Sequence, residues 1–261
     1  MLKEFLPPVM LNYLTGFFYG WKGNYSSWQE AKNKCSGYDS TEILSKVKES
    51  LLKVKKGEVV FERDSVLFDK IQYSFPLLSA LLYITAAKNG KLNILDFGGS
   101  LGSSYYQNIN ALKELHELNW CVVEQKHFVK EGLNAFESEQ LHFFYDISSC
   151  IEKYKADVFM LASVLQYMEK PYALLDQIIK INIEYIIIDR TPFLESGNDR
   201  ITIQKVPKKI YDASYPCWFL NEKNVLSSLS PYYDLVFEGT SPERLNIRHA
   251  ALKCFFLKRK K

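Results

Sequence analysis

The sequence of 261 residues predicts an α/β fold built around a mostly parallel sheet. After Gly90, short apolar runs alternate with segments of helical pattern, and this alternation is typical of βαβ units. A glycine-rich turn follows the first run. Two runs near the C-terminus, Leu235–Glu238 and Ala251–Leu257, have no helix-length segment between them, so we expect an antiparallel pair at one edge of the sheet.

The other expected strands all belong to the parallel part of a seven-stranded sheet. They are Leu92–Phe97, Trp120–Val123, Leu141–Tyr145, Val158–Ala162 and Tyr185–Ile188. Before Gly90 the pattern is helical at 27–34, 41–55 and 75–87, where Ser27 and Thr41 supply capping side chains. We therefore expect an N-terminal helical cap at 1–90 and a ligand-binding domain at 91–261, with an aromatic insertion at about 190–222.

Composition excludes several classes of protein. Hydrophobic residues make up 47% and charged residues 24%, as in a globular protein with a substantial core. A net charge of +3 is too small to imply a nucleic-acid partner. The five cysteines form no CxxC pair, which predicts no metal site and favours reduced thiols in a cytoplasmic protein. No apolar stretch is long enough to span a bilayer, although the run Phe5–Trp21 leaves peripheral membrane contact as an alternative to packing on the domain.

The segment Asp96-Phe-Gly-Gly-Ser-Leu-Gly102 carries the strongest functional signal. It ends the first expected strand, and Ser103-Ser104 then opens a helical run that we expect to continue to Leu118. Glycines let a ligand approach the backbone, and the first amides of a helix offer unpaired donors. Such a turn suits either a dinucleotide pyrophosphate or the amino-acid part of S-adenosylmethionine (SAM).

The spacing within this turn distinguishes the two ligands. Nicotinamide-binding turns usually read G-x-G-x-x-G, whereas here an acid precedes the pair Gly98-Gly99, and Gly102 completes the turn. A carboxylate at Asp96 would repel a pyrophosphate and attract the ammonium group of SAM. Glu124 follows the second expected strand, where a carboxylate can accept hydrogen bonds from both ribose hydroxyls. We therefore predict a SAM site.

Ligands of open α/β sheets bind beyond the carboxyl ends of the strands, so the segments after the fourth and fifth strands should face the reaction site. Aromatic residues of the insertion could stack on a sugar or simply pack in the core. A base within reach of an acceptor hydroxyl would assist methyl transfer. The candidates are Ser163 for cofactor binding, Arg190, Tyr215 and Trp218 for substrate binding, and Asp189, Tyr167 and Tyr211 as the base, none of them preferred.

Motifs over nearly the whole chain support a family resemblance. They include Tyr19-Gly20 and Gly37-Tyr38-Asp39 near the N-terminus, the glycine turn, Arg190-Thr-Pro-Phe193, and Ala213-Ser-Tyr-Pro-Cys-Trp218. The chain resembles a family of class I methyltransferases that are often encoded among bacterial surface-polysaccharide genes. The resemblance implies a Rossmann-like fold, SAM as cofactor, Asp146 near the adenine amino group, and a small-molecule or lipid-linked saccharide as acceptor.

The leading hypothesis is therefore SAM-dependent O-methylation of a sugar or glycan intermediate in surface-polysaccharide biosynthesis. One alternative is a catalytically silent binding module that keeps the fold within a biosynthetic complex. A second is an NAD-dependent oxidoreductase or epimerase, which Asp96 and the paired C-terminal strands oppose.

Overall fold

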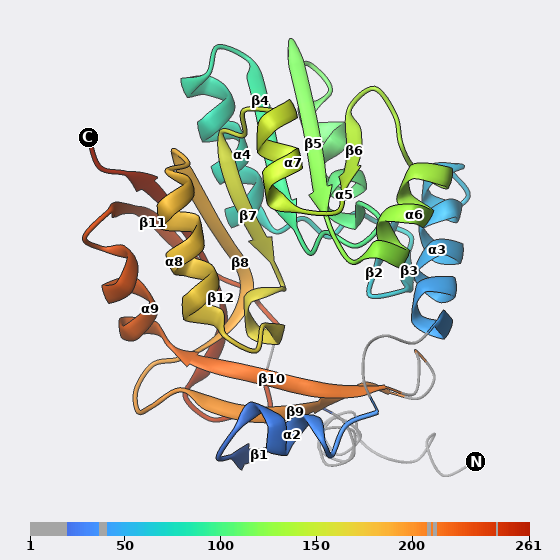
Figure 1. Cartoon of the computed structure of the whole chain (residues 1–261). Helices are drawn as coiled ribbons and strands as arrows, with labels where there is room; N and C mark the ends of the chain where they lie inside the picture. The colour runs from blue at the N-terminus through green and yellow to red at the C-terminus, as the bar shows by residue number, and fades with distance from the viewer. Residues whose placement is uncertain (1–19, 37–40, 208–209, 211–212, 244) are drawn as a thin grey trace.

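The computed structural model describes residues 20–36, 41–207, 210, 213–243 and 245–261. Seven strands form the central part of its main sheet, which is mostly parallel as predicted (Figure 1). Five are parallel neighbours, and the last strand in the chain runs antiparallel between the fifth and the sixth. Numbered along the chain, the order across the sheet is 3-2-1-4-5-7-6. This is the arrangement of the class I methyltransferase fold. The strands are β4 (Lys91–Phe97), β5 (Glu117–Val123), β6 (Leu141–Phe144), β7 (Val158–Ala162), β8 (Tyr185–Leu194), β11 (Tyr233–Thr240) and β12 (Ala250–Arg259).

Helices cover both faces of this sheet, which is why its central strands are apolar throughout. Ile186, Ile187 and Ile188 of β8 are fully buried. One face packs on residues of α3, α4, α5 and α6, and the other on residues of α7, α8 and α9. The helices are α3 (Thr41–Lys55), α4 (Phe75–Ala87), α5 (Ser103–Leu112), α6 (Lys126–Ala135), α7 (Ile147–Lys153), α8 (Pro171–Ile181) and α9 (Glu222–Leu229).

The part of the chain before β4 contains strands as well as helices, so the expectation of a helical cap at 1–90 is corrected. Besides α3, α4 and the short helix α2 (Trp28–Lys32), it forms β1 (Gly20–Tyr25), β2 (Phe61–Arg63) and β3 (Val66–Phe68). The helices α3 and α4 share one apolar cluster with the sheet. They are therefore part of the central core.

The aromatic insertion is a β-structure. The strand β8 continues to Leu194, beyond its expected end, and is followed by an antiparallel pair, β9 (Arg200–Lys205) and β10 (Ser214–Asn221). The end of β10 pairs with the end of β8, and β1 pairs with the outer edge of β9. The whole sheet therefore has ten strands, because β1, β9 and β10 are added to the seven expected ones and extend the sheet beyond the carboxyl ends of the parallel strands (Figure 1).

Two further expectations concern single segments. The helix after the glycine turn ends at Leu112, not at Leu118, because Glu117–Val123 forms β5.

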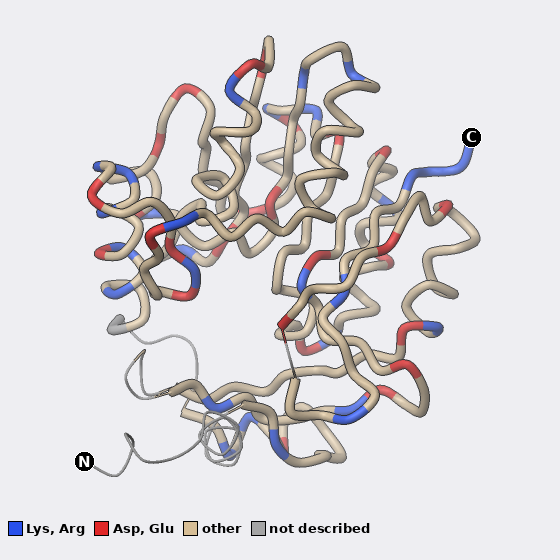
Figure 2. Tube along the Cα trace, turned by 180° about the vertical axis from the view of Figure 1, so that it is seen from behind, with Lys and Arg blue, Asp and Glu red and all other residues tan. Residues whose placement is uncertain are grey.

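Most of the run considered for membrane contact, Phe5–Trp21, lies outside the described residues. Among the described helices, none has the length and apolar character needed to cross a bilayer. Basic and acidic residues are interspersed over the described trace, and the C-terminal end is basic (Figure 2).

Candidate functional site

A cavity of about 1100 Å³ lies at the carboxyl ends of the parallel strands. Residues that follow β4, β5, β6 and β7 line it, together with residues of β8, of the β2–β3 hairpin and of the β9–β10 extension. This is the position at which open α/β sheets bind their ligands. The predicted site residues that line it are Gly98, Gly99, Glu124, Asp146, Ser163, Tyr167, Asp189, Arg190 and Tyr215.

The glycine turn brings bare backbone to the cavity wall. Gly98 has a φ of 72°, and a Cβ built on it would lie 2.7 Å from Val164 Cγ2. A Cβ on Gly99 would overlap the Asp96 carboxylate. Gly102, in the left-handed conformation with a φ of 96°, is the N-cap of α5 and does not line the cavity. Side chains are thus excluded at Gly98 and Gly99. A ligand could contact the backbone there, next to the first turn of α5.

Asp96 does not face the cavity, contrary to the sequence-based expectation. Its side chain is fully buried beneath the turn, where Oδ2 accepts a hydrogen bond of 2.9 Å from Trp120 Nε1. Within the described structure Oδ1 has no hydrogen-bond partner. Burial raises the pKa of Asp96 to about 7. Asp96 is therefore placed to support the turn at Gly99. It is not placed to contact a ligand ammonium group directly.

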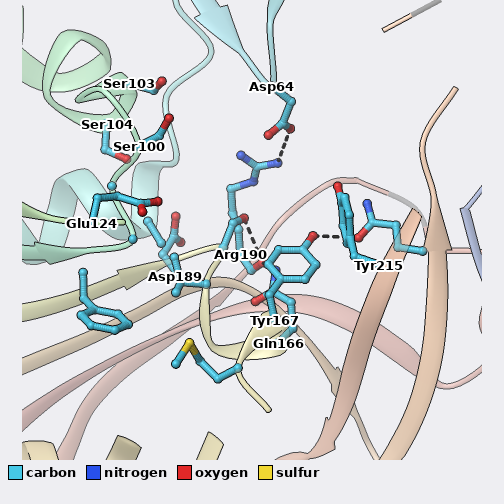
Figure 3. Close-up of a pocket in the computed structure, with 18 of the residues that line it drawn as sticks. Asp64, Ser100, Ser103, Ser104, Glu124, Gln166, Tyr167, Asp189, Arg190 and Tyr215 are labelled. Carbon is cyan, nitrogen blue, oxygen red and sulfur yellow. Dashed lines mark hydrogen bonds and ion pairs between the residues drawn. The ribbon is translucent and has the colours of Figure 1, made fainter. Parts of the chain in front are cut away.

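The acids after β5 and β6 do line the cavity. Glu124 is half-buried, and its Oε2 accepts a hydrogen bond from the amide of Gln125 (Figure 3). Asp146 is exposed and caps α7, since its Oδ1 accepts a hydrogen bond of 2.8 Å from Ser149 N. Both carboxylates thus face the same cavity as the glycine turn.

The segment after β7 is hydrogen-bonded to the middle of β8. Ser163 N donates to Asp189 O at 2.9 Å, and Ser163 Oγ donates to Arg190 O at 3.3 Å. The Asp189 side chain is buried at the cavity wall, where Oδ1 accepts a bond of 3.0 Å from Ser74 Oγ. Burial raises the pKa of Asp189. A fixed carboxyl whose pKa is raised by burial therefore lies at the cavity wall.

Two aromatic residues form the wall on the side of the β9–β10 extension. Tyr167 OH donates to Gln204 Oε1 at 2.7 Å, and its ring meets Tyr215 edge to face at a centroid distance of 5.2 Å (Figure 3). These contacts fix the direction of the Tyr167 hydroxyl.

Trp218, predicted to bind substrate, lies outside the cavity lining. It stacks on Trp28 at 6.0 Å, and its Nε1 donates to Met168 O at 3.0 Å. Trp218 therefore packs α2 against the segment after β7, which is a structural role. Tyr211, a candidate base, lies outside the described residues.

Sequence reasoning missed the contribution of the β2–β3 hairpin, which places Glu62, Arg63, Asp64 and Ser65 at the cavity. The Glu62 carboxylate accepts hydrogen bonds from Ser103 Oγ and from Ser65 N, and burial raises its pKa to about 7. The turn residues Asp64 and Ser65 both have positive φ, as a two-residue hairpin requires, but they are not the usual Asn-Gly or Asp-Gly pair. Glu243, also missed, lines the cavity from the loop before β12.

The raised pKa values of Asp96 and Glu62 predict that the chain loses stability as pH rises. In the folded state both acids hold their protons to about pH 7, whereas the unfolded values are 3.8 and 4.5. The free energy of unfolding should therefore fall between about pH 4 and pH 7 and stay low above it. Asp96→Asn keeps an acceptor for Trp120 and removes one of these titrations. The melting temperature of both proteins should fall between pH 5.5 and 8. We expect the fall for this variant to be smaller than the fall for the parent, with a difference of about 3–6 °C.

The matched control for this experiment is Asp234→Asn, whose side chain is 71% exposed. Its thermal unfolding profile should follow the parent at every pH. Parallel pH profiles for Asp96→Asn and the parent would contradict the assigned protonation of Asp96.

No family model and no curated protein matches this chain. Among solved structures, it is similar to the N-terminal domain of EvdMO1 in the presence of S-adenosylhomocysteine (SAH) and D-fucose, with 15% identity over 85% of this chain and 100% of that chain and a TM-score of 0.48. It is also similar to magnesium protoporphyrin IX methyltransferase from Synechocystis PCC 6803 with bound SAM. The identity is 12% over 86% of this chain and 100% of that chain, and the TM-score is 0.47.

A third similar structure is the 1,6-didemethyltoxoflavin-N1-methyltransferase of Burkholderia thailandensis, with 12% identity over 87% of this chain and 95% of that chain and a TM-score of 0.46. The identities and scores of all three are low. The fold class therefore rests on the strand order of this chain, and its function on the residues of its own cavity.

Proposed function

We propose that this chain is a SAM-dependent methyltransferase that methylates a hydroxyl group of a saccharide. The observation that carries the proposal is that the glycine turn, the first turn of α5 and Glu124 line one cavity at the carboxyl ends of a sheet with class I strand order. A saccharide acceptor is in keeping with the polar and aromatic residues of the same cavity and with the family resemblance of the sequence.

The residues present fit SAM. The backbone at Gly98 and Gly99, where a Cβ would meet Val164 or Asp96, lines the cavity without side chains, and it would hold the methionine part together with the first turn of α5. Glu124 would accept hydrogen bonds from the ribose, and Asp146 would lie toward the adenine. When bound, SAM supplies a methyl group on a positively charged sulfur. The carboxylates on this side of the cavity favour a cation.

The remaining residues would position the acceptor and receive its proton. Asp189 is our choice for the base, because burial raises its pKa toward the pH at which the enzyme would act and Ser74 fixes its orientation. Tyr167, held by Gln204, would bind an acceptor hydroxyl. The rings of Tyr167 and Tyr215 would exclude water from one wall. Positioning supplies much of the rate enhancement in such a displacement.

Thermal unfolding with SAM, SAH or NAD tests the cofactor. A ligand at about 100 times its dissociation constant stabilises a protein by roughly 2.7 kcal/mol, and for a chain of this size we expect a rise in melting temperature of about 5–10 °C. SAM and SAH should each produce this rise, and NAD should not. A rise with NAD alone would refute the proposal in favour of an oxidoreductase or epimerase. Binding of SAH without methyl transfer to any saccharide tested would favour a silent binding module.

A further inference from the structure

Two arginines meet at one carboxylate within the cavity. Arg63 ends β2, Arg190 lies in β8, and Glu243 precedes β12. Glu243 Oε1 lies 2.9 Å from Arg63 Nη1, and Glu243 Oε2 lies 3.4 Å from Arg190 Nη2. All three side chains line the cavity and are partly exposed. We call Arg63 and Arg190 the arginine pair.

The arginine pair has more donor capacity than its acidic neighbours use. Arg190 makes one long contact with Glu243 where an arginine–carboxylate pair is often bidentate, and its buried Nε has no partner within the described structure. Asp64 lies 4.0 Å from Arg190 Nη2, but its side chain is 69% exposed, so this contact contributes little. Burial and the charge of Arg190 lower the pKa of Arg63. Nearby carboxylates, including Glu243, in turn raise the pKa of Arg190. The two cations are thus held close together around a carboxylate that they share.

The backbone of Arg190 is itself strained. Its φ is 49°, which is uncommon and unfavourable for a residue with a Cβ. Its carbonyl accepts hydrogen bonds from Ser163 Oγ and Gln166 Nε2, which hold this conformation. In it, the guanidinium points toward Asp64 on the hairpin, away from Asp189 (Figure 3). Such strain at a cavity wall is typical of a residue positioned for function.

The residues that line the cavity differ on the two sides of Arg190. Glu124, the acid near the glycine turn, lies on one side of Arg190, and Tyr167 and Tyr215 lie on the other (Figure 3). A cationic methyl donor would occupy the acidic side, so the arginine pair faces the space left for the acceptor. Two partly buried cations beside the acceptor space would serve no purpose for a neutral acceptor, since taking charge out of water is costly.

We propose that the arginine pair binds an anionic oxygen group of the methyl acceptor, of phosphoryl or carboxylate type, in the place that the Glu243 carboxylate holds in this structure. That carboxylate shows that both guanidiniums can contact two oxygens of one oxyanion. The inference rests on the proposed function, because it assigns the rest of the cavity to the methyl donor. It narrows the acceptor to a charged saccharide.

Calorimetric titration of the full chain at constant ionic strength tests this site, with inorganic pyrophosphate, inorganic phosphate and malonate as probes. Arg63→Ala and Arg190→Lys should each weaken binding of the preferred probe by about 10-fold or more, because lysine keeps the charge but loses the bidentate geometry. Glu243→Ala should strengthen it by about 10-fold, because it removes the competing carboxylate. Such a gain cannot arise from misfolding. Lys113→Ala, a charge change at a side chain that is 70% exposed, should have no effect.

SAH titrated in parallel separates the two proposals. If the variants bind SAH normally and neither the parent nor Glu243→Ala binds any of the three anions, the anion site is refuted and the proposed function stands. Equal losses in Lys113→Ala and the arginine variants would also refute it, because they would show a nonspecific charge effect. Failure of the parent to bind SAH would refute the proposed function. A preference for pyrophosphate and phosphate over malonate would identify a phosphoryl group, and the reverse a carboxylate.

Discussion

Gly98→Ala is expected to weaken SAH binding by more than about 100-fold, equivalent to roughly 2.7 kcal/mol, while the chain still folds. The positive φ of Gly98 is unfavourable for alanine, and the new Cβ would lie 2.7 Å from Val164 Cγ2. The turn cannot simply move away, because Gly98 N donates to Val123 O at 2.8 Å. The strain must therefore displace the backbone that faces the cavity. Calorimetric titration with SAH measures the loss.

Gly197→Ala is the matched control. Gly197 also has a positive φ, of 87°, but a Cβ there would meet nothing within 4 Å, and the residue does not line the cavity. This variant should lose some thermal stability and keep its SAH affinity. Adding Val164→Ala to Gly98→Ala should restore part of the affinity, since it removes the atoms that the new Cβ would meet. Unchanged SAH binding by Gly98→Ala would show that the ligand does not contact this turn.

The central sheet could be predicted from sequence because its signals are local. Each parallel strand is a continuous apolar run bounded by turn residues, and burial on both faces demands such runs. The helix at 75–87 was predicted with its observed bounds, and Pro76 lies in its first turn. The acid at the end of the second strand, Glu124, was placed at the cavity by the same reasoning.

Strands whose partners lie far away in the chain could not be predicted in this way. The pairing of Gly20 with Lys205 joins β1 to β9, and neither strand is a continuous apolar run. The strands β2 and β3 have only three residues each. Nothing local indicates that they meet, so the arginine pair and its contact with Glu243 were not foreseen.

The case of Asp96 shows a different limit. The sequence correctly indicates an acid at the end of a strand before a glycine turn, but it does not indicate which way the side chain points. Because β4 is buried on both faces, no alternation of polar and apolar residues marks its faces. Asp96 lies beside Trp120 in the core, where the indole N–H needs an acceptor.

Glu124→Ala is expected to weaken SAH binding by about 100-fold, because a carboxylate that accepts from both ribose hydroxyls makes two charge-assisted hydrogen bonds of roughly 1.5–3 kcal/mol each, part of which water replaces. Glu124→Gln keeps one acceptor oxygen and loses the charge, so its loss should be smaller, about 10-fold. Calorimetric titration of the three proteins with SAH gives the graded series.

Glu169→Ala separates a specific contact from general attraction of a cation. Glu169 is exposed and lines the same cavity after β7, so its removal changes the local charge equally. We expect less than about 3-fold loss, as for an exposed charge. If Glu169→Ala and Glu124→Ala lost the same affinity, Glu124 would contribute only to the field of the cavity. A graded loss confined to Glu124 would instead require hydrogen bonds to neighbouring hydroxyls, and so would fix the ribose at the end of β5.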